Sequence, residues 1–275
     1  MTEQRECEGD VVLVTGGGGG IGFATVALLS ARGASVVALG PDTAQLSKVH
    51  DLEGAVAVVG DAADEDDVWR AVDTALDRWG RLTAVACCAG VGTFGTVLDD
   101  SEQWYAALRA NLDTAYVTTR RCLPALMDSR GSIVLVSSLA GVVAVPGSAA
   151  YTTAKHALIG LTRSLAVDFG PVGVRANVVC PGQTRTGMLD QVMDTIGGRA
   201  GLDRDSAYER AASVTPLRRP ADPQEVAEVI AFLASRRSSV VTGAVLMADA
   251  GVSAADLSLT GLMPPVSGDG GRTHP

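Results

Sequence analysis

The chain has 275 residues, which is enough for one large α/β domain and rather few for two. Hydrophobic residues make up 47% of it and charged residues 19%, a composition typical of a globular protein and not of a disordered one. The formal charge of -9 and the pI of about 4.8 argue against binding to nucleic acids and to anionic membranes, so we expect small molecules and copies of the same chain as partners.

Cysteine usage and the first residues indicate where the protein works. The five cysteines are odd in number and none has C-x-x-C spacing, which favours a reducing compartment over a disulfide framework or a metal site. The first ten residues are polar and acid-rich, unlike a signal peptide. The uncharged stretch 131–154 is interrupted by Gly, Pro and Ser, so it predicts a buried strand and a loop instead of a membrane span. We therefore expect a cytoplasmic protein.

Short apolar runs alternate with helical stretches along the chain. Most of these runs are continuously apolar, as strands buried on both faces of a parallel sheet must be. The predicted strands are 11–15, 35–39, 55–59, 83–88, 132–137, 175–180 and 243–248. The predicted helices are 21–32, 64–79, 102–127, 151–169 and 223–234.

This order predicts an α/β fold of the doubly wound (Rossmann) type, a seven-stranded parallel sheet with helices on both faces. Residues 10–253 contain no repeat and no linker, so we predict a single domain over 1–253. Within it, about 184–222 would form a lid over the substrate. The alternation stops at 254–275, where Gly and Pro are frequent, and we predict a C-terminal tail there.

A glycine-rich loop joins the first predicted strand to the first helix, with the sequence T-G-G-G-G-G-I-G at 15–22. A loop that brings its backbone close to a pyrophosphate and aims a helix N-terminus at it has no room for side chains. The run fits both G-x-G-x-x-G and T-G-x-x-x-G-x-G and does not decide between them. Five glycines could also form a flexible turn, but their place between a strand and a helix favours a dinucleotide site.

Tyr151 and Lys155 stand four residues apart on a predicted helix and therefore share one face. A phenol has an ordinary pKa near 10 and is a poor base at neutral pH, but an ammonium and a cationic nicotinamide nearby would both favour the phenolate. Alone, this pair is more often just two residues on a helix flank.

Order and spacing add specificity to the pair. Ser138 stands 13 residues before Tyr151 at the end of an apolar strand, and Asn111 lies inside the preceding long helix. Together with the glycine loop, these residues resemble the short-chain dehydrogenase/reductase family in its single-domain branch, over roughly residues 10–252.

The resemblance implies a role for each of these residues. Tyr151 would be the acid/base, Ser138 would hydrogen-bond the substrate oxygen, and Lys155 would hold the nicotinamide ribose and lower the tyrosine pKa. Asn111 would position a water in the proton relay, and Asp61 would meet the adenine. The expected cofactor contacts are Gly16, Gly18, Gly19, Gly20, Ile21, Gly22, Asp42, Asp61, Ala62, Ala89, Gly90, Tyr151, Lys155, Pro181, Gly182, Thr184 and Thr186.

The sequence departs from the family pattern after the fourth strand. The family usually has Asn-Asn-Ala-Gly there, and this chain has Cys87-Cys88-Ala89-Gly90. Thiols cannot reproduce the hydrogen bonds of an amide. We interpret both cysteines as small buried residues.

Charges predict NAD as the cofactor, with NADP less favoured. A ribose 2′-phosphate needs a cation in the glycine loop or just after the second strand, and neither place has one. Asp42 has roughly the spacing of a carboxylate that binds the ribose hydroxyls. By length, however, Gly40 stands at the usual acidic position, and Arg32 could swing in from the end of the first helix.

Other classes of function fit less well. None of the three histidines stands at a strand end, which argues against a Ser/His/Asp hydrolase, and the chain lacks the metal ligands of a metal-dependent alcohol dehydrogenase. The alternative is a non-catalytic dinucleotide-binding subunit on the same fold. The expected substrate is an uncharged alcohol or ketone, because the predicted lining is mostly apolar: Val91, Thr93, Phe94, Leu139, Val142, Val143, Gln183, Met188, Leu189 and Val192.

The family also implies a homo-oligomer, a tetramer. An apolar stripe on the helix from Tyr151 could pack against a partner helix or against the protein's own sheet. Its members are Ala154, Ala157, Leu158, Leu161 and Leu165.

Overall fold

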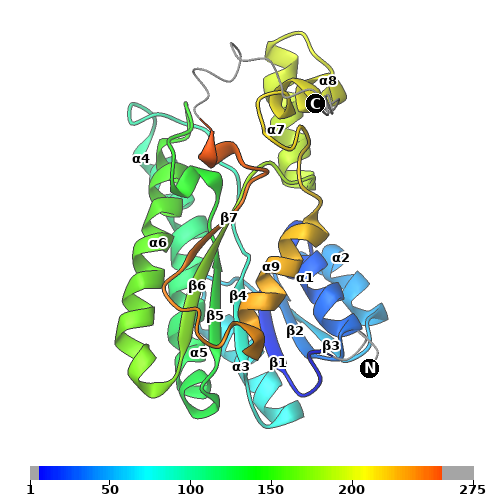
Figure 1. The fold of residues 1–275 in the computed structure, drawn as a ribbon, viewed down its shortest axis with the longest axis vertical. Helices are drawn as coiled ribbons and strands as arrows, with labels where there is room; N and C mark the ends of the chain where they lie inside the picture. Colours follow the sequence, from blue (N-terminus) through cyan, green and yellow to red (C-terminus); the bar gives the residue numbers. More distant parts are fainter. Residues whose placement is uncertain (1–5, 256–275) are drawn as a thin grey trace, which may run out of the picture.

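The strands form a single parallel sheet, as predicted. The computed structural model describes residues 6–255. Its strands are β1 (Val11–Thr15), β2 (Ser35–Gly40), β3 (Ala55–Val59), β4 (Ala84–Cys87), β5 (Ser132–Val136), β6 (Arg175–Pro181) and β7 (Val245–Ala248). They lie in the order β3-β2-β1-β4-β5-β6-β7, and all neighbours are parallel (Figure 1). Because β2 and β4 lead away from β1 in opposite directions, a crevice for ligands is expected at the carboxyl end of β1.

Helices cover both faces of this sheet (Figure 1). In the described part of the chain they are α1 (Gly20–Ala31), α2 (Thr43–Leu46), α3 (Glu65–Trp79), α4 (Ser101–Leu108), α5 (Thr114–Ser129), α6 (Ala149–Phe169), α7 (Gly187–Arg199), α8 (Arg204–Ala212) and α9 (Pro223–Ala234). α3, α5 and α6 pack on one face, and α1 and α9 pack on the other. Short 3-10 turns lie at Ser47–Asp51, Leu139–Gly141, Gly170–Val172, Arg236–Ser238 and Val252–Ala254.

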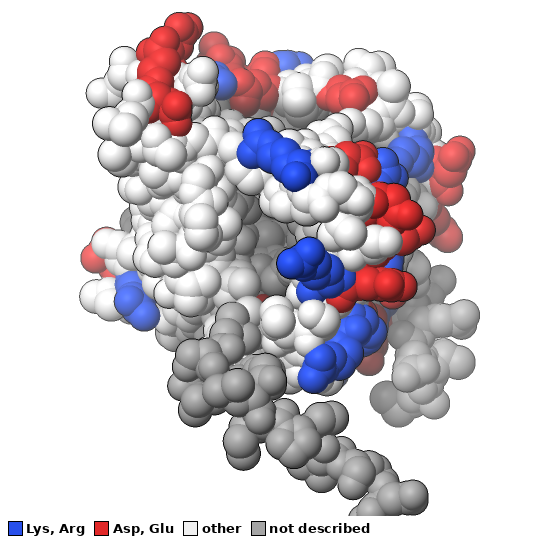
Figure 2. Space-filling view, turned by 90° about the horizontal axis from the view of Figure 1, so that it is seen from above, with Lys and Arg blue, Asp and Glu red and all other residues white. Residues whose placement is uncertain are grey.

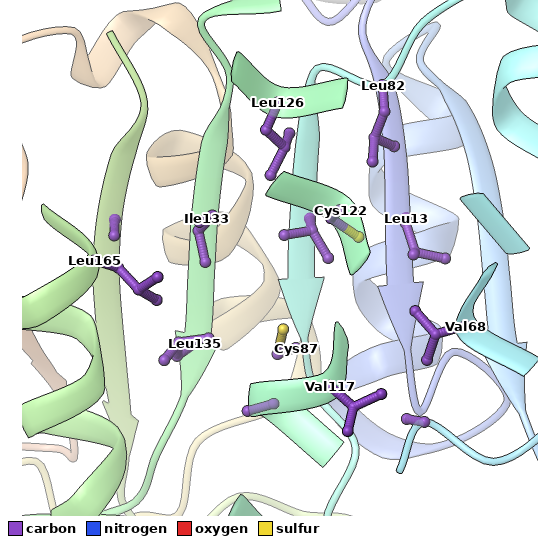
Figure 3. Close-up of a cluster of buried hydrophobic side chains, with 14 of the residues drawn as sticks. Leu13, Val68, Leu82, Cys87, Val117, Cys122, Leu126, Ile133, Leu135 and Leu165 are labelled. Carbon is purple, nitrogen blue, oxygen red and sulfur yellow. The ribbon is translucent and has the colours of Figure 1, made fainter. Parts of the chain in front are cut away.

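Successive strand residues are buried on opposite faces, which explains the continuous apolar runs. Leu13 of β1 belongs to the cluster under α3, α5 and α6, whereas Val12 and Val14 belong to the cluster under α1 and α9. Figure 3 shows the first cluster, in which Ile133 of β5 and Cys122 of α5 also lie. Each such buried aliphatic side chain stabilises the fold by about 1.5–3 kcal/mol relative to exposure.

One predicted helix is interrupted. The stretch predicted as a single helix over 102–127 consists of α4, a π-helical turn at Arg109–Asp113, and α5. Asn111 accounts for the interruption: its Nδ2 donates to the carbonyl of Ala107 at 3.0 Å, and its Oδ1 accepts from the backbone N–H of Val91 at 3.1 Å. The turn therefore ties the helix to the loop after β4. The other predicted boundaries differ from the observed ones by at most two residues.

The segment predicted as a lid contains α7 and α8, which lie above the carboxyl ends of the strands (Figure 1). These helices hold together through a small cluster of their own, formed by Met193, Ala207 and Tyr208. The Tyr208 hydroxyl also donates to Asp190 at 2.9 Å. The predicted tail lies outside the described residues except for 254 and 255. No helix in the described residues is long and apolar enough to cross a membrane.

Candidate active site

The glycine loop folds back tightly, so that its first and last glycines lie close together. Gly16 and Gly20 adopt positive φ of 66° and 48°, which glycine tolerates without strain. A Cβ built on Gly22 would lie 2.1 Å from the carbonyl oxygen of Gly16, and one on Gly17 would lie 2.8 Å from the Cβ of Ala38. Larger residues are therefore excluded at both positions by the fold itself.

The start of α1 suits a phosphate. Its N-cap, Gly19, offers no side chain to the first backbone N–H groups, and the first turn contains no acidic residue. Unpaired N–H groups at a helix N-terminus, together with the helix dipole, bind anions. The loop and α1 thus fit the pyrophosphate of a dinucleotide.

Two other segments meet the glycine loop. A Cβ on Gly16 would lie 3.0 Å from the Cα of Ala89, just after β4, and a Cβ on Gly20 would lie 3.2 Å from the Thr186 methyl, after β6. The backbone N–H of Ala89 also donates to the Thr15 hydroxyl at 3.3 Å. The three segments in which most cofactor contacts were predicted therefore adjoin one another at the carboxyl edge.

Gly90 brings two of the predicted catalytic residues together. A Cβ there would lie 2.8 Å from Oδ1 of Asn111 and 3.2 Å from Nζ of Lys155. Both side chains are buried, with 1% and 4% exposure. The missing side chain at position 90 thus makes the room in which the amide and the ammonium lie.

The lysine and the tyrosine are neighbours on α6. Lys155 Nζ donates to the carbonyl of Val136 at 3.1 Å and lies 5.6 Å from the centroid of the Tyr151 ring. Burial lowers the pKa of Lys155 to about 8. Burial also raises the pKa of Tyr151, and the Ser138 hydroxyl lowers it only in part. In the protein alone burial outweighs the hydrogen bond from Ser138, so a lowered tyrosine pKa would require the additional positive charge of a bound cofactor.

Ser138 is held at the end of β5 by a 3-10 turn. Its Oγ accepts from the N–H of Ala140 at 3.1 Å, which caps the turn. Ser137 Oγ donates to the carbonyl of Lys155 at 2.8 Å, and a Cβ on Gly141 would lie 2.9 Å from that same oxygen. The turn therefore packs directly on α6, beside Tyr151.

The two cysteines that replace asparagines are buried, as interpreted from the sequence. Cys87 is 3% exposed and belongs to the main core cluster, where Figure 3 shows it. Cys88 is half-buried, and burial raises the pKa of its thiol to about 12. Both thiols are therefore protonated and unreactive at neutral pH.

At the predicted adenine end, Asp61 follows β3. Its Oδ1 accepts from the N–H of Ala63 at 2.8 Å, and its Oδ2 forms an ion pair with Nη1 of Arg109 at 2.7 Å. Ala62 beside it is buried. Arg109 was not among the predicted site residues, because it stands 48 positions from Asp61 and matches no motif.

At the predicted ribose end, Asp42 is the N-cap of α2. Its Oδ1 caps α2 by accepting from the N–H groups of Ala44 and Gln45 at 2.8 and 3.1 Å. The two nearest cations along the chain are engaged elsewhere: Arg32 pairs with Glu228 at 2.8 Å, and the Lys48 ammonium lies 4.9 Å from a phenylalanine ring.

A hollow lies beside the loop that follows β4, and none of the four predicted catalytic residues lines it. A cavity of about 510 Å³ is lined by Val91, Thr93, Phe94, Gly95, Thr96, Asp99, Asp100, Gln103, Trp104, Ala106, Ala107, Ala110 and Ala150. It shares the first three residues with the predicted lining. Of the others, Met188 and Val192 on α7 face Gly92, since a Cβ there would lie 3.6 and 3.9 Å from their side chains. Seen from above, one wall of the hollowed surface bears few charges, whereas the opposite side bears many (Figure 2).

The remaining predicted lining residues lie around these. Val142 and Val143 are exposed after the Ser138 turn, and Leu139 and Leu189 are half-buried. The side-chain oxygen of Gln183 is buried and has no hydrogen-bond partner among residues 6–255. An acceptor left without a donor beside the segment after β6 fits a site that a bound amide or hydroxyl completes.

Comparison with known proteins shows the family of the chain. A family model described as enoyl-(acyl carrier protein) reductase matches residues 16–253. The chain belongs to the short-chain dehydrogenase/reductase family. Members of this family are oxidoreductases that bind nicotinamide cofactors.

Several relatives match this chain over nearly its whole length and over nearly the whole of their own. Protein MoaE of Klebsiella aerogenes is 39% identical, over 90% of this chain and 96% of its own. The 2,5-dichloro-2,5-cyclohexadiene-1,4-diol dehydrogenase of Sphingobium indicum is 37% identical, over 90% and 99%. The ligand-free structure of Thermoplasma acidophilum aldohexose dehydrogenase superposes with a TM-score of 0.83 at 28% identity, over 96% and 98%.

Proposed function

We propose that the protein transfers a hydride between NAD(H) and a secondary alcohol or ketone, with Tyr151 as its acid/base. The observation that carries the proposal is the convergence of Asn111, Ser138, Tyr151 and Lys155 at the carboxyl edge, beside a glycine loop that fits a pyrophosphate. A non-catalytic dinucleotide-binding subunit would have no need of all four.

In alcohol oxidation, the hydroxyls of Ser138 and Tyr151 would hold the substrate oxygen, and the Tyr151 oxygen would take its proton. The nicotinamide ring, when bound, accepts the hydride in this direction and donates it in ketone reduction. The Lys155 ammonium would favour the phenolate through its charge. Asn111, buried beside Lys155, would position the water through which the proton leaves. Holding these groups in place supplies much of the catalysis.

A panel of secondary alcohols and ketones, assayed by nicotinamide absorbance, tests this function. Turnover of at least one uncharged member is the expected result, since the predicted lining is mostly apolar. A protein that binds the dinucleotide and turns over no alcohol or ketone of a broad panel would instead be the non-catalytic subunit.

The proposed cofactor is NAD(H) in preference to NADP(H). The pairing of Arg32 with Glu228 supports this preference, because it occupies the cation that could otherwise have reached a 2′-phosphate. Asp42 near the ribose end would repel such a phosphate by about 4 kcal/mol per unit charge at 4 Å and an effective dielectric near 20, before screening.

The value of kcat/KM measured with each cofactor on one substrate tests the preference. We expect NAD(H) to be favoured at least tenfold, and Asp42→Ala to reduce the ratio. Asp42→Ala removes both the charge and the cap of α2. Asp42→Asn is the matched control, because asparagine keeps the cap and removes only the charge. A kcat/KM for NADP(H) equal to that for NAD(H) contradicts the charge argument.

A further inference from the structure

At the predicted adenine end, two contacts hold the carboxylate of Asp61 and a third holds its backbone. Asp61 accepts from Ala63 through Oδ1, pairs with Arg109 through Oδ2, and donates its own N–H to Oδ2 of Asp67 at 2.8 Å. An ionised carboxylate has about four lone-pair sites. The described contacts use two of them, so Asp61 keeps the capacity to accept from a ligand.

The π-helical turn positions Arg109 beside Asp61. It is the first residue of the turn, and Asn111 anchors the same turn to Val91 after β4. The side chains of Arg109 and Asp61 remain 54% and 41% exposed at 2.7 Å from each other. Exposed ion pairs contribute little to folding stability, so stability alone gives no reason for this one. Both groups are open to a ligand that binds at this edge.

We propose that Arg109 is the second half of the adenine site: it donates to the ring nitrogen beside the amino group, while Asp61 accepts from that amino group. Adenine presents an amino donor next to ring-nitrogen acceptors. A carboxylate only accepts and a guanidinium only donates, so the pair offers the complementary pattern. The inference rests on the proposed dinucleotide-binding function and adds a residue that determines the choice of base.

The alternative to direct contact is that Arg109 only orients Asp61. Direct contact predicts a loss that depends on the ring nitrogen, whereas orientation predicts a loss that depends only on the amino group. Analogues of NAD in which N1 or N7 of adenine is replaced by C–H separate the two, because each removes one acceptor and leaves the amino group.

The experiment measures dissociation constants by titration calorimetry, with no turnover required. NAD and its 1-deaza and 7-deaza analogues are titrated into the unsubstituted protein, into Arg109→Leu, and into Arg120→Leu as the matched control. Arg120 lies on α5, is equally exposed, and pairs with Glu65, which Arg121 also contacts; no contact of Arg120 with Asp61 is found in the described residues. Melting temperatures of the variants confirm that each is folded.

We expect the unsubstituted protein to bind one of the two deaza analogues roughly tenfold more weakly than NAD, the effect of one charge-assisted hydrogen bond. Arg109→Leu should weaken NAD binding by the same factor and bind NAD and that analogue equally well. Arg120→Leu should behave as the unsubstituted protein does.

Two results overturn the inference. One is NAD binding by Arg109→Leu within twofold of the unsubstituted protein. The other is an equal loss for all three ligands in that variant, which would assign Arg109 the orientation of Asp61 only. A failure of the unsubstituted protein to bind NAD would refute the proposed function itself, and the inference with it.

Discussion

At the scale of single residues, the buried lysine has a consequence for stability. The pKa of Lys155 is lowered by burial from 10.5 to about 8. Between these values the unfolded chain holds a proton that the folded protein has released, so this residue makes stability rise with pH. Below about pH 8 the folded protein bears the cost of burying the charge.

Lys155→Met tests this linkage. Methionine is similar in length and does not titrate, so the melting temperature of the wild type relative to this variant should rise from pH 8 to pH 10. We compare the difference in melting temperature between the two proteins, because cysteines and tyrosines titrate in the same pH range in both and their effects cancel. A difference that stays constant or falls over this range would show that Lys155 remains charged when folded.

The sequence predicted the site residues that have a fixed spacing in the chain, and it did not predict Arg109, which has none. Tyr151 and Lys155 share a helix, and Ser138 closes a neighbouring strand, so their proximity follows from the fold. Arg109 reaches Asp61 from 48 residues away through a turn whose geometry depends on the hydrogen bonds of Asn111. No local pattern carries that information.

At the scale of elements, the sheet and its flanking helices were predictable because burial on both faces forces continuous apolar runs. The π-helical turn was not, because one extra residue leaves a helical pattern largely unchanged. The α7 and α8 helices also escaped prediction. The α8 helix is polar, and the apolar residues Met188, Leu189 and Val192 of α7 were interpreted as substrate lining; the two helices bury only a small cluster around Tyr208.

The glycines of α1 and α6 should respond in opposite ways to the same change. Gly22→Ala places a methyl group 2.1 Å from the Gly16 carbonyl and should lower the melting temperature sharply and abolish dinucleotide binding. Gly160→Ala, in α6, meets nothing within 4 Å and should stabilise the helix by about 1 kcal/mol. Thermal unfolding of both variants tests this, and a neutral Gly22→Ala would refute the close packing of the loop.

At the scale of the whole molecule, the apolar stripe on α6 belongs to the protein's own core. Leu158 and Leu165 are buried under the sheet, and Leu161 packs against them, which is the second of the two interpretations from the sequence. Val167 on α6, Tyr105 on α4 and Leu98 before it are 74%, 68% and 93% exposed.

We still predict a homo-oligomer, a tetramer, because resemblance to the short-chain dehydrogenase/reductase family implies one. Sedimentation velocity at micromolar concentration should give a species several times heavier than the 28.1 kDa chain. A single species at the mass of one chain would end this prediction.

The central claim, that Tyr151 moves the proton, is tested most directly by Tyr151→Phe, with turnover and NAD affinity measured on the same preparation. The ring stays and the hydroxyl is lost, so the dissociation constant for NAD should stay within about twofold of the wild-type value. Turnover should fall roughly 100- to 10,000-fold, as expected for the loss of a general acid/base. A variant that keeps more than about a tenth of wild-type turnover, with the chemical step shown to limit the rate, would contradict the assignment.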